Sequence, residues 1–111
     1  MKMIYISHPY TGNEEENRTK AHLIAAKLAA KYPAVLFVNP LTAMKHAVAA
    51  KLTYGDILDQ CIELVNRSDG IIMTGNWRES RGCTKEYKFA KAAKIKIYDG
   101  IMGFEQNFEN D

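Results

Sequence analysis

Short apolar runs alternate along this chain with longer segments in which apolar residues recur at helical spacing. The expected strands are residues 2–7, 35–38, 70–74 and 95–98, and the expected helices are residues 13–31, 53–67 and 80–94. Strands that alternate with helices predict a parallel sheet with helices on both faces, and right-handed crossovers leave few topologies. We therefore expect an α/β fold, flavodoxin-like or Rossmann-like, whose open sheet of about four strands has the order 2-1-3-4.

The remaining segments carry weaker signals. Asn13, with Glu16 three residues later, resembles a capping box at the start of the first helix. Residues 41–51 are rich in alanine and are compatible with a short helix. The tail contains Phe104 and Phe108, which would pack as an arm on this subunit or on a neighbour. The short chain and this aromatic tail favour a homo-oligomer, at least a homodimer.

Length and composition narrow the function classes. A chain of 111 residues fits one domain over residues 1–111. A net charge of +2 with dispersed lysines indicates neither a nucleic acid polymer nor a membrane as partner, and no run approaches the roughly 20 apolar residues of a membrane span. Cys61 and Cys83 fall on apolar helix faces, so we expect buried free thiols in a reducing cytoplasm. Zinc-ligand spacing, the Rossmann glycine triplet and the Walker lysine motif are missing, so we expect no metal and no cofactor.

Glu86 stands where an apolar residue is expected. At about 100° per residue, it falls near the middle of the apolar side of helix 80–94, opposite the lysines. A carboxylate that faces the core is costly unless it is paired or hydrogen-bonded. Such a carboxylate either is reactive, or caps a neighbouring element or pairs with a buried arginine.

The expected topology gathers several loops at one edge of the sheet. Ligands of open α/β sheets bind at the carboxyl ends of the strands, near the point where the strand order reverses. That edge holds residues 7–12, 39–40, 74–77 and 98–99, and both Ser80 and Glu86 enter from the third of these loops. Asp69 precedes its strand at the opposite edge, so we interpret it as a turn or capping residue.

Two of these loops lead into the amino terminus of a helix, where backbone N–H groups and the helix dipole favour anions. The first loop contains Ser7, Thr11 and Gly12, and the second contains Ser80 and Gly82. Together they either hold the phosphate and the sugar of a nucleotide or contain ordinary helix caps.

Three further residues at this edge each have two interpretations. Trp77, the only tryptophan, either stacks on a base or covers the pocket, or it packs in the core or against another subunit. His8 is either an acid or base at a strand end, or a capped or exposed turn residue. Tyr5 either places its hydroxyl near the pocket or packs its ring in the core.

These residues together resemble the nucleoside 2-deoxyribosyltransferase-like superfamily. The likeness is to a small bacterial and prophage branch of largely unassigned function, similar to deoxynucleoside monophosphate N-glycosidases. It covers nearly the whole chain and is carried by residues 5–12, 39–40, 68–69 and 75–86, of which the last block is the most specific.

The resemblance implies cleavage or transfer of an N-glycosidic bond on a nucleoside or deoxynucleoside monophosphate, with Glu86 as the nucleophile. It also implies that Tyr5 helps to hold the nucleophile and that Ser80 contacts a phosphate or sugar oxygen. With His8, we take Glu86 and Tyr5 as the candidate catalytic residues. The candidate substrate-binding residues are Ser7, Tyr10, Thr11, Gly12, Asn39, Gly75, Asn76, Trp77, Ser80 and Gly82.

One departure from the superfamily pattern concerns the general acid. The aspartate expected eight residues before Asp69 is Cys61 in this chain, and Asp59 lies about 160° away on the polar face of the same helix. A thiol is a poor proton donor to a purine or pyrimidine. Either His8 or another group supplies the proton, or the chemistry is altered or lost. The alternative function is therefore a nucleotide-binding protein that uses the same pocket without turnover.

Overall fold

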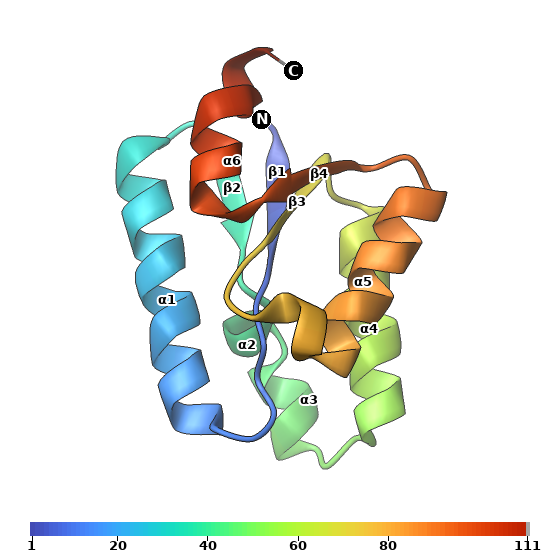
Figure 1. Ribbon diagram of the computed structural model, residues 1–111. Helices are drawn as coiled ribbons and strands as arrows, with labels where there is room; N and C mark the ends of the chain where they lie inside the picture. The colour runs from blue at the N-terminus through green and yellow to red at the C-terminus, as the bar shows by residue number, and fades with distance from the viewer. Residues whose placement is uncertain (111) are drawn as a thin grey trace.

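A four-stranded parallel sheet forms the centre of the computed structural model, which describes residues 1–110 (Figure 1). The strands are β1 (Met3–Ser7), β2 (Leu36–Val38), β3 (Gly70–Met73) and β4 (Lys96–Asp99). They lie in the order β2-β1-β3-β4, and all three neighbouring pairs are parallel. The α/β fold and the strand order predicted from the alternation of elements are confirmed.

Helices cover both faces of the sheet. The described helices are α1 (Glu14–Lys31), α2 (Pro40–Ala43), α3 (Lys45–Ala49), α4 (Tyr54–Asn66), α5 (Arg81–Ala92) and α6 (Gly100–Asn107), with short 3-10 helices η1 (Trp77–Glu79) and η2 (Phe108–Asn110). In Figure 1, α1 and α6 lie on one side of the strands, and α4 and α5 lie on the other. Two separate core clusters, one on each side, follow from this arrangement.

The alternation of side chains along β1 decides which residues meet α5. Ile4 and Ile6 belong to the cluster beneath α1 and α6, whereas Tyr5 belongs to the cluster beneath α4 and α5. Because successive side chains of a strand point to opposite faces, Ser7 projects on the same side as Tyr5. Both side chains are fully buried. The sheet therefore presents two hydroxyl groups to the face that α5 covers.

Two of the long helices begin at a side-chain cap, and a third does not. Thr53 caps α4 by accepting a 3.1 Å hydrogen bond from the Asp56 amide, and Ser80 caps α5 by accepting a 3.2 Å bond from the Cys83 amide. The predicted capping box at Asn13 is wrong. Its side-chain amide donates to the Glu16 carboxylate, so neither side chain binds the backbone as a capping box requires.

The tail packs on its own sheet. Phe104 of α6 is fully buried, and its ring lies 5.2 Å from that of Tyr32 and 5.0 Å from that of Tyr98. Gly100 has a φ of 74°, which lets the chain turn directly from β4 into α6. Because the aromatic side chains are used within this chain, they no longer support a partner subunit. The homodimer remains a prediction without that support.

Within residues 1–110, none of the helices has both the length and the apolar character needed to cross a membrane.

Candidate functional site

Glu86 lies buried in α5 with both carboxylate oxygens hydrogen-bonded to β1. The Tyr5 hydroxyl donates to Oε2 over 2.5 Å, and the Ser7 hydroxyl donates to Oε1 over 2.7 Å. The residue is only 6% exposed. The helix-face argument is confirmed in placing this carboxylate toward the core. Its partners are two hydroxyl groups. The alternative interpretation, in which Glu86 pairs with a buried arginine or caps a neighbouring element, is not what the structure shows.

Two features of the surroundings of Glu86 shift its pKa in opposite directions. Burial raises the pKa of Glu86, whereas the hydrogen bonds from Tyr5 and Ser7 lower that pKa, and burial has the larger effect. Burial and the nearby Glu86 charge raise the pKa of Tyr5 well above its ordinary value, so the phenol keeps its proton and remains a donor. The carboxylate is thus held by neutral donors in a poorly solvated place.

Cys61 of α4 adjoins the same pair. Burial, followed by the Glu86 charge, raises the pKa of the Cys61 thiol to about 11, while a hydrogen bond with Tyr5 lowers it. The thiol therefore keeps its proton at neutral pH. Burial likewise raises the pKa of Cys83. Both cysteines are free and buried, as predicted.

His8 is anchored through Thr74, which follows β3. The distance from His8 Nδ1 to Thr74 Oγ1 is 2.8 Å, and Thr74 Oγ1 lies 2.8 Å from the Ser7 carbonyl oxygen. The carbonyl can only accept, so the single hydroxyl proton of Thr74 goes to Ser7. His8 Nδ1 must then donate to Thr74, which places the ring proton on Nδ1. Burial and the positive charge of Lys20 lower the pKa of His8.

Two adjoining cavities open from these groups. The first, here called the glutamate cavity, has a volume of about 490 Å³ and is bounded by Tyr5, His8, Cys61 and Glu86. Its other walls are largely apolar and include Met44, Val48, Ile57 and Leu58. The second, here called the polar cavity, has a volume of about 890 Å³. Residues that border both cavities are His8, Thr11, Tyr54, Ser80 and Gly82.

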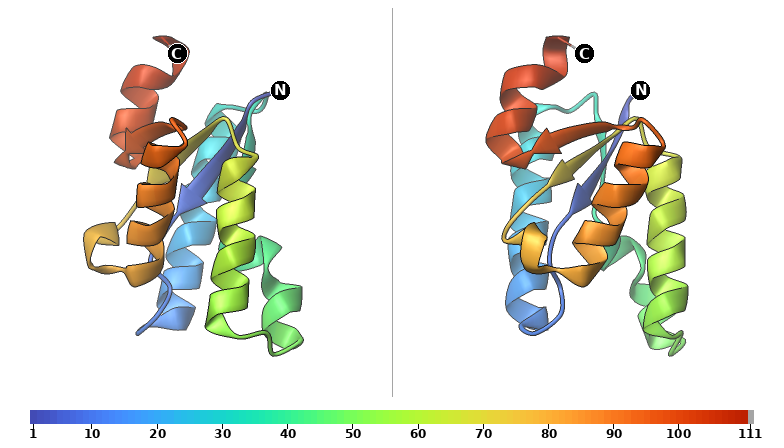
Figure 2. Two further views of the ribbon diagram at one scale, coloured as in Figure 1. Left: turned by 90° about the vertical axis from the view of Figure 1, so that its right-hand side faces the viewer. Right: turned by 45° about the vertical axis from the view of Figure 1, so that its right-hand side comes forward.

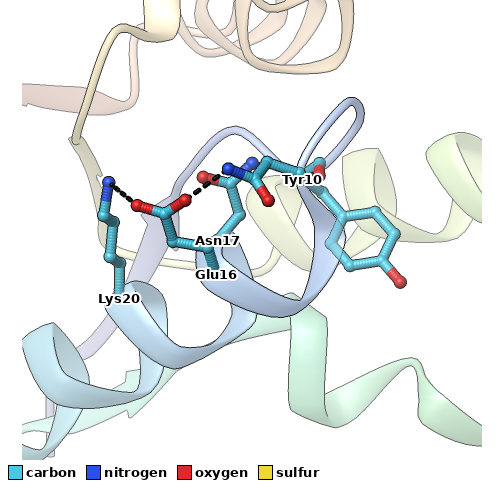
Figure 3. A network of polar contacts seen from close by, with 5 residues as sticks. Tyr10, Glu16, Asn17 and Lys20 are labelled. Atoms are coloured by element: carbon cyan, nitrogen blue, oxygen red, sulfur yellow. Dashed lines mark hydrogen bonds and ion pairs between the residues drawn. The ribbon is translucent and has the colours of Figure 1, made fainter.

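The polar cavity lies where two helices begin. Its lining includes the loop before α1 and the amino terminus of α5, together with Lys20 and Arg81. Figure 2 shows η1 and the start of α5 beyond the carboxyl ends of β1 and β3. Lys20 forms an ion pair with Glu16 at 2.9 Å, and the ring of Tyr10 points away from that pair (Figure 3). The lining therefore combines two basic side chains and the starts of two helices with the carboxylates of Glu16 and Glu79.

Most of the predicted substrate-binding residues border these cavities. The polar cavity is lined by Thr11, Gly12, Gly75, Asn76, Ser80 and Gly82. Tyr10 borders the glutamate cavity, and its hydroxyl accepts a 2.9 Å hydrogen bond from Arg18. Ser7 is placed differently, because it is fully buried and its hydroxyl is bound to Glu86. It supports the carboxylate from below and does not face the space for a ligand.

Asn39 and Trp77 do not border either cavity. Asn39 caps α2 by accepting a 3.2 Å hydrogen bond from the Leu41 amide. Trp77 is 8% exposed, and its ring centroid lies 4.8 Å from that of Tyr87. The 3-10 turn η1 directs the indole into the core, with the Arg78 guanidinium 4.4 Å above it. Trp77 thus packs in the core, as one of its interpretations predicted, whereas its stacking on a base stays a prediction.

Tyr54 is a site residue that the sequence reasoning missed. It is half exposed and borders both cavities. A Cβ atom added at Gly82 would lie 3.1 Å from the Tyr54 hydroxyl oxygen, so the absence of a side chain there makes room for the phenol. The available signal was its position directly after the Thr53 cap, where α4 extends beyond the core.

No cluster of three or more histidine, cysteine, aspartate or glutamate side chains suited to a metal ion occurs in the part of the chain that the structure describes.

The family described as Domain of unknown function (DUF4406) matches residues 2–99. The chain belongs to this family. The DUF4406 match contains all four strands and every site residue from Tyr5 to Glu86, and it ends at the last residue of β4. No curated protein sequence matches the chain.

The fold of this chain has a counterpart among solved structures. It is similar to the 2-desoxiribosyltransferase from Leishmania mexicana, with a TM-score of 0.64 and 19% sequence identity. The similarity covers 88% of this chain and 63% of that protein, so the chain spans less than two thirds of the enzyme's length. The predicted resemblance to the nucleoside 2-deoxyribosyltransferase-like superfamily is confirmed as a likeness of fold.

Proposed function

We propose that this protein cleaves or transfers the N-glycosidic bond of a nucleoside or deoxynucleoside monophosphate, with Glu86 as the nucleophile. The observation that carries this proposal is the buried Glu86 carboxylate, held by Tyr5 and Ser7 at the base of a cavity on the carboxyl edge of the sheet. Burying a charge without an arginine or lysine partner is costly, and such carboxylates are concentrated at functional sites.

The reaction begins when a Glu86 oxygen attacks the anomeric carbon of the sugar. The bond from that carbon to the base nitrogen breaks, and the base leaves with the bonding electrons and takes up a proton. The product is a glycosyl ester of Glu86. Water or a second base then attacks the anomeric carbon from the face that the first base left, opposite the ester, and Glu86 is released. Tyr5 and Ser7 orient the carboxylate in the first step and accommodate its returning charge in the second.

The two cavities suit the two parts of a nucleotide. The glutamate cavity has the apolar walls that a base and a sugar require, and Glu86 borders it. The polar cavity adds Lys20, Arg81 and the amino terminus of α5, which would favour the phosphate. Ser80 borders both spaces, in keeping with a contact to a sugar or phosphate oxygen.

Cys61 favours a second candidate function, which is nucleotide binding without turnover. The superfamily pattern predicts a carboxylic acid at this position, to protonate the leaving base. A thiol with a pKa of about 11 is a weak donor for that purpose. In a binding protein, Glu86 and the two cavities would recognise the nucleotide while the bond stays intact. A cytoplasmic location and a homodimeric state remain predictions for either function.

Release of free base distinguishes the two functions. Purified protein at high concentration is incubated with a panel of nucleosides and deoxynucleoside monophosphates, with and without an acceptor base, and the free bases are separated by chromatography. Base release by the wild type and its loss in Glu86→Gln support the enzyme. Nucleotide binding by calorimetry without base release from any panel member supports the binding protein.

A further inference from the structure

We propose that His8 Nε2 is the general base of the second half-reaction, which takes the proton of the water that attacks the glycosyl ester of Glu86. This inference rests on the proposed N-glycosidic activity and assigns a step of it to a specific atom. It is carried by the hydrogen bonds of His8, by the accessibility of its ring and by its place between the two cavities.

The tautomer of His8 is fixed by its neighbours. Thr74 donates its only hydroxyl proton to the Ser7 carbonyl, and it therefore accepts from His8 Nδ1 at 2.8 Å. In the neutral ring the proton is on Nδ1 and the lone pair is on Nε2. A histidine whose Nδ1–H is anchored in this way presents Nε2 as an acceptor, which is the arrangement of a positioned base.

The Nε2 atom of His8 has no hydrogen-bond partner among residues 1–110. In the same range every side-chain nitrogen or oxygen atom that is closed to solvent has a partner. It follows that Nε2 is accessible to solvent. His8 borders both the glutamate cavity and the polar cavity, so we place the attacking water beside this atom.

His8 is tied to Glu86 through its neighbour in the chain. His8 directly follows Ser7, whose hydroxyl binds Glu86 Oε1 at 2.7 Å. Thr74 binds one side of the imidazole, and the main chain of Gly75 lies against it, because a Cβ added there would be 3.1 Å from His8 Cε1. His8 and Glu86 both border the glutamate cavity, where the glycosyl ester would lie.

These contacts also distinguish a base from an acid. The single proton of the neutral ring is committed to Thr74, and burial and Lys20 lower the pKa of His8, so the ring is neutral at neutral pH. His8 is thus poorly placed to replace the missing acid at Cys61, one of the roles that the sequence left open.

In the step we propose, water oxygen bonds to the anomeric carbon, and the ester bond breaks. Its electron pair returns to Glu86, and Nε2 takes the water proton and later releases it to solvent.

The test variant is His8→Asn, because the asparagine amide can keep the donation to Thr74 while Nε2 is removed. Rapid-quench measurement of base release is combined with intact-protein mass spectrometry, using the panel member that the wild type turns over. We expect the first equivalent of base to appear at the wild-type rate and the glycosyl protein to accumulate. Steady-state release should then be about 100- to 10,000-fold slower. Added imidazole should accelerate the second phase in the smaller variant His8→Ala.

Three outcomes would overturn the assignment. Steady-state release by His8→Asn at the wild-type rate excludes Nε2 as the base. The assignment also fails if the first turnover of His8→Asn slows as much as its steady-state release and no glycosyl protein accumulates. His8 would then act in the first step or stabilise the fold. A melting curve of the variant distinguishes these two roles. A wild type that releases no base from any panel member overturns the proposed function together with this inference.

Discussion

The Tyr5 hydroxyl donates a 2.5 Å hydrogen bond to Glu86 Oε2 across 81 positions of the sequence. One residue lies in the middle of β1 and the other in the first turns of α5, so this bond joins the strand that opens the fold to the helix that completes the site. Both groups are buried, and each depends on the other as a polar partner. The chemistry we propose depends on this bond and on its companion from Ser7.

We expect Tyr5→Phe to slow the first release of base by about 100-fold, because the change removes one of the two hydrogen bonds that orient the attacking carboxylate, and a misplacement of about 1 Å can cost that much in rate. Single-turnover base release measures the effect. The matched control is Tyr32→Phe, which removes a phenol oxygen on the opposite face of the sheet. Equal rates for the two variants would contradict a role for Tyr5 in holding the nucleophile.

Cys61→Asp should restore the general acid that the superfamily pattern places here. A second carboxyl group near buried Glu86 has its pKa raised by burial and by the neighbouring charge, so it carries a proton at neutral pH. We expect base release to increase about 100-fold or more over the Cys61→Asn control, which has the same size and no acidic proton. Equal rates for the aspartate and asparagine variants would show that another group already protonates the leaving base.

The raised pKa of Glu86 predicts how stability depends on pH. Because burial raises this pKa, the folded chain binds the proton more tightly than the unfolded chain. This contribution to stability is fully present below the ordinary glutamate pKa, and it is lost as pH rises through the higher value in the fold. Glutamine stays neutral throughout. The stability of Glu86→Gln relative to the wild type should therefore increase as pH rises through this window.

Urea denaturation followed by the fluorescence of Trp77, the only tryptophan, measures this difference at several pH values. Glu15→Gln, which changes an exposed carboxylate on α1, is the control and should show no such trend. A constant difference between Glu86→Gln and the wild type over the whole range would show that the carboxylate is not perturbed by burial.

The sequence predicted the fold and the central residue because both depend on simple periodicities. The alternation of strands and helices implied the parallel sheet, and the helical repeat placed Glu86 on the buried side of its helix. Tyr5 was identified as a partner only through the family resemblance. Its partnership with Glu86 follows from the pairing of β1 with β3 and from the packing of α5 on that face, which no local pattern specifies.

The other residues of the candidate site could not be predicted from the sequence, because their positions depend on how side chains are oriented in loops and short turns. The His8–Thr74 contact joins two loops 66 positions apart, and it exists because the two parallel strands before them end side by side. Trp77 turns inward because η1 is a tight 3-10 turn, whereas an isolated tryptophan in a polar loop gave no direction. Tyr54 is half exposed because α4 begins beyond the core, and no residue pattern marks where along the helix the core ends.

Trp77→Ala should destabilise the fold by about 3–5 kcal/mol, because the indole fills the core beside Tyr87. Chemical denaturation followed by circular dichroism measures this loss. Trp77→Phe keeps a ring against Tyr87 and should retain wild-type nucleotide affinity while folded. A folded Trp77→Phe protein with strongly reduced nucleotide affinity would contradict the structural role and restore the stacking interpretation.

The central claim is that Glu86 forms a covalent bond with the sugar. The most direct measurement is mass spectrometry of the rapidly quenched protein after mixing with a substrate that releases base, followed by proteolysis and peptide sequencing. We expect a mass increase of one glycosyl group on the α5 peptide, located on Glu86 and lost in Glu86→Gln. Base release that continues with no glycosyl adduct on this peptide, or with the adduct on another residue, would contradict this claim.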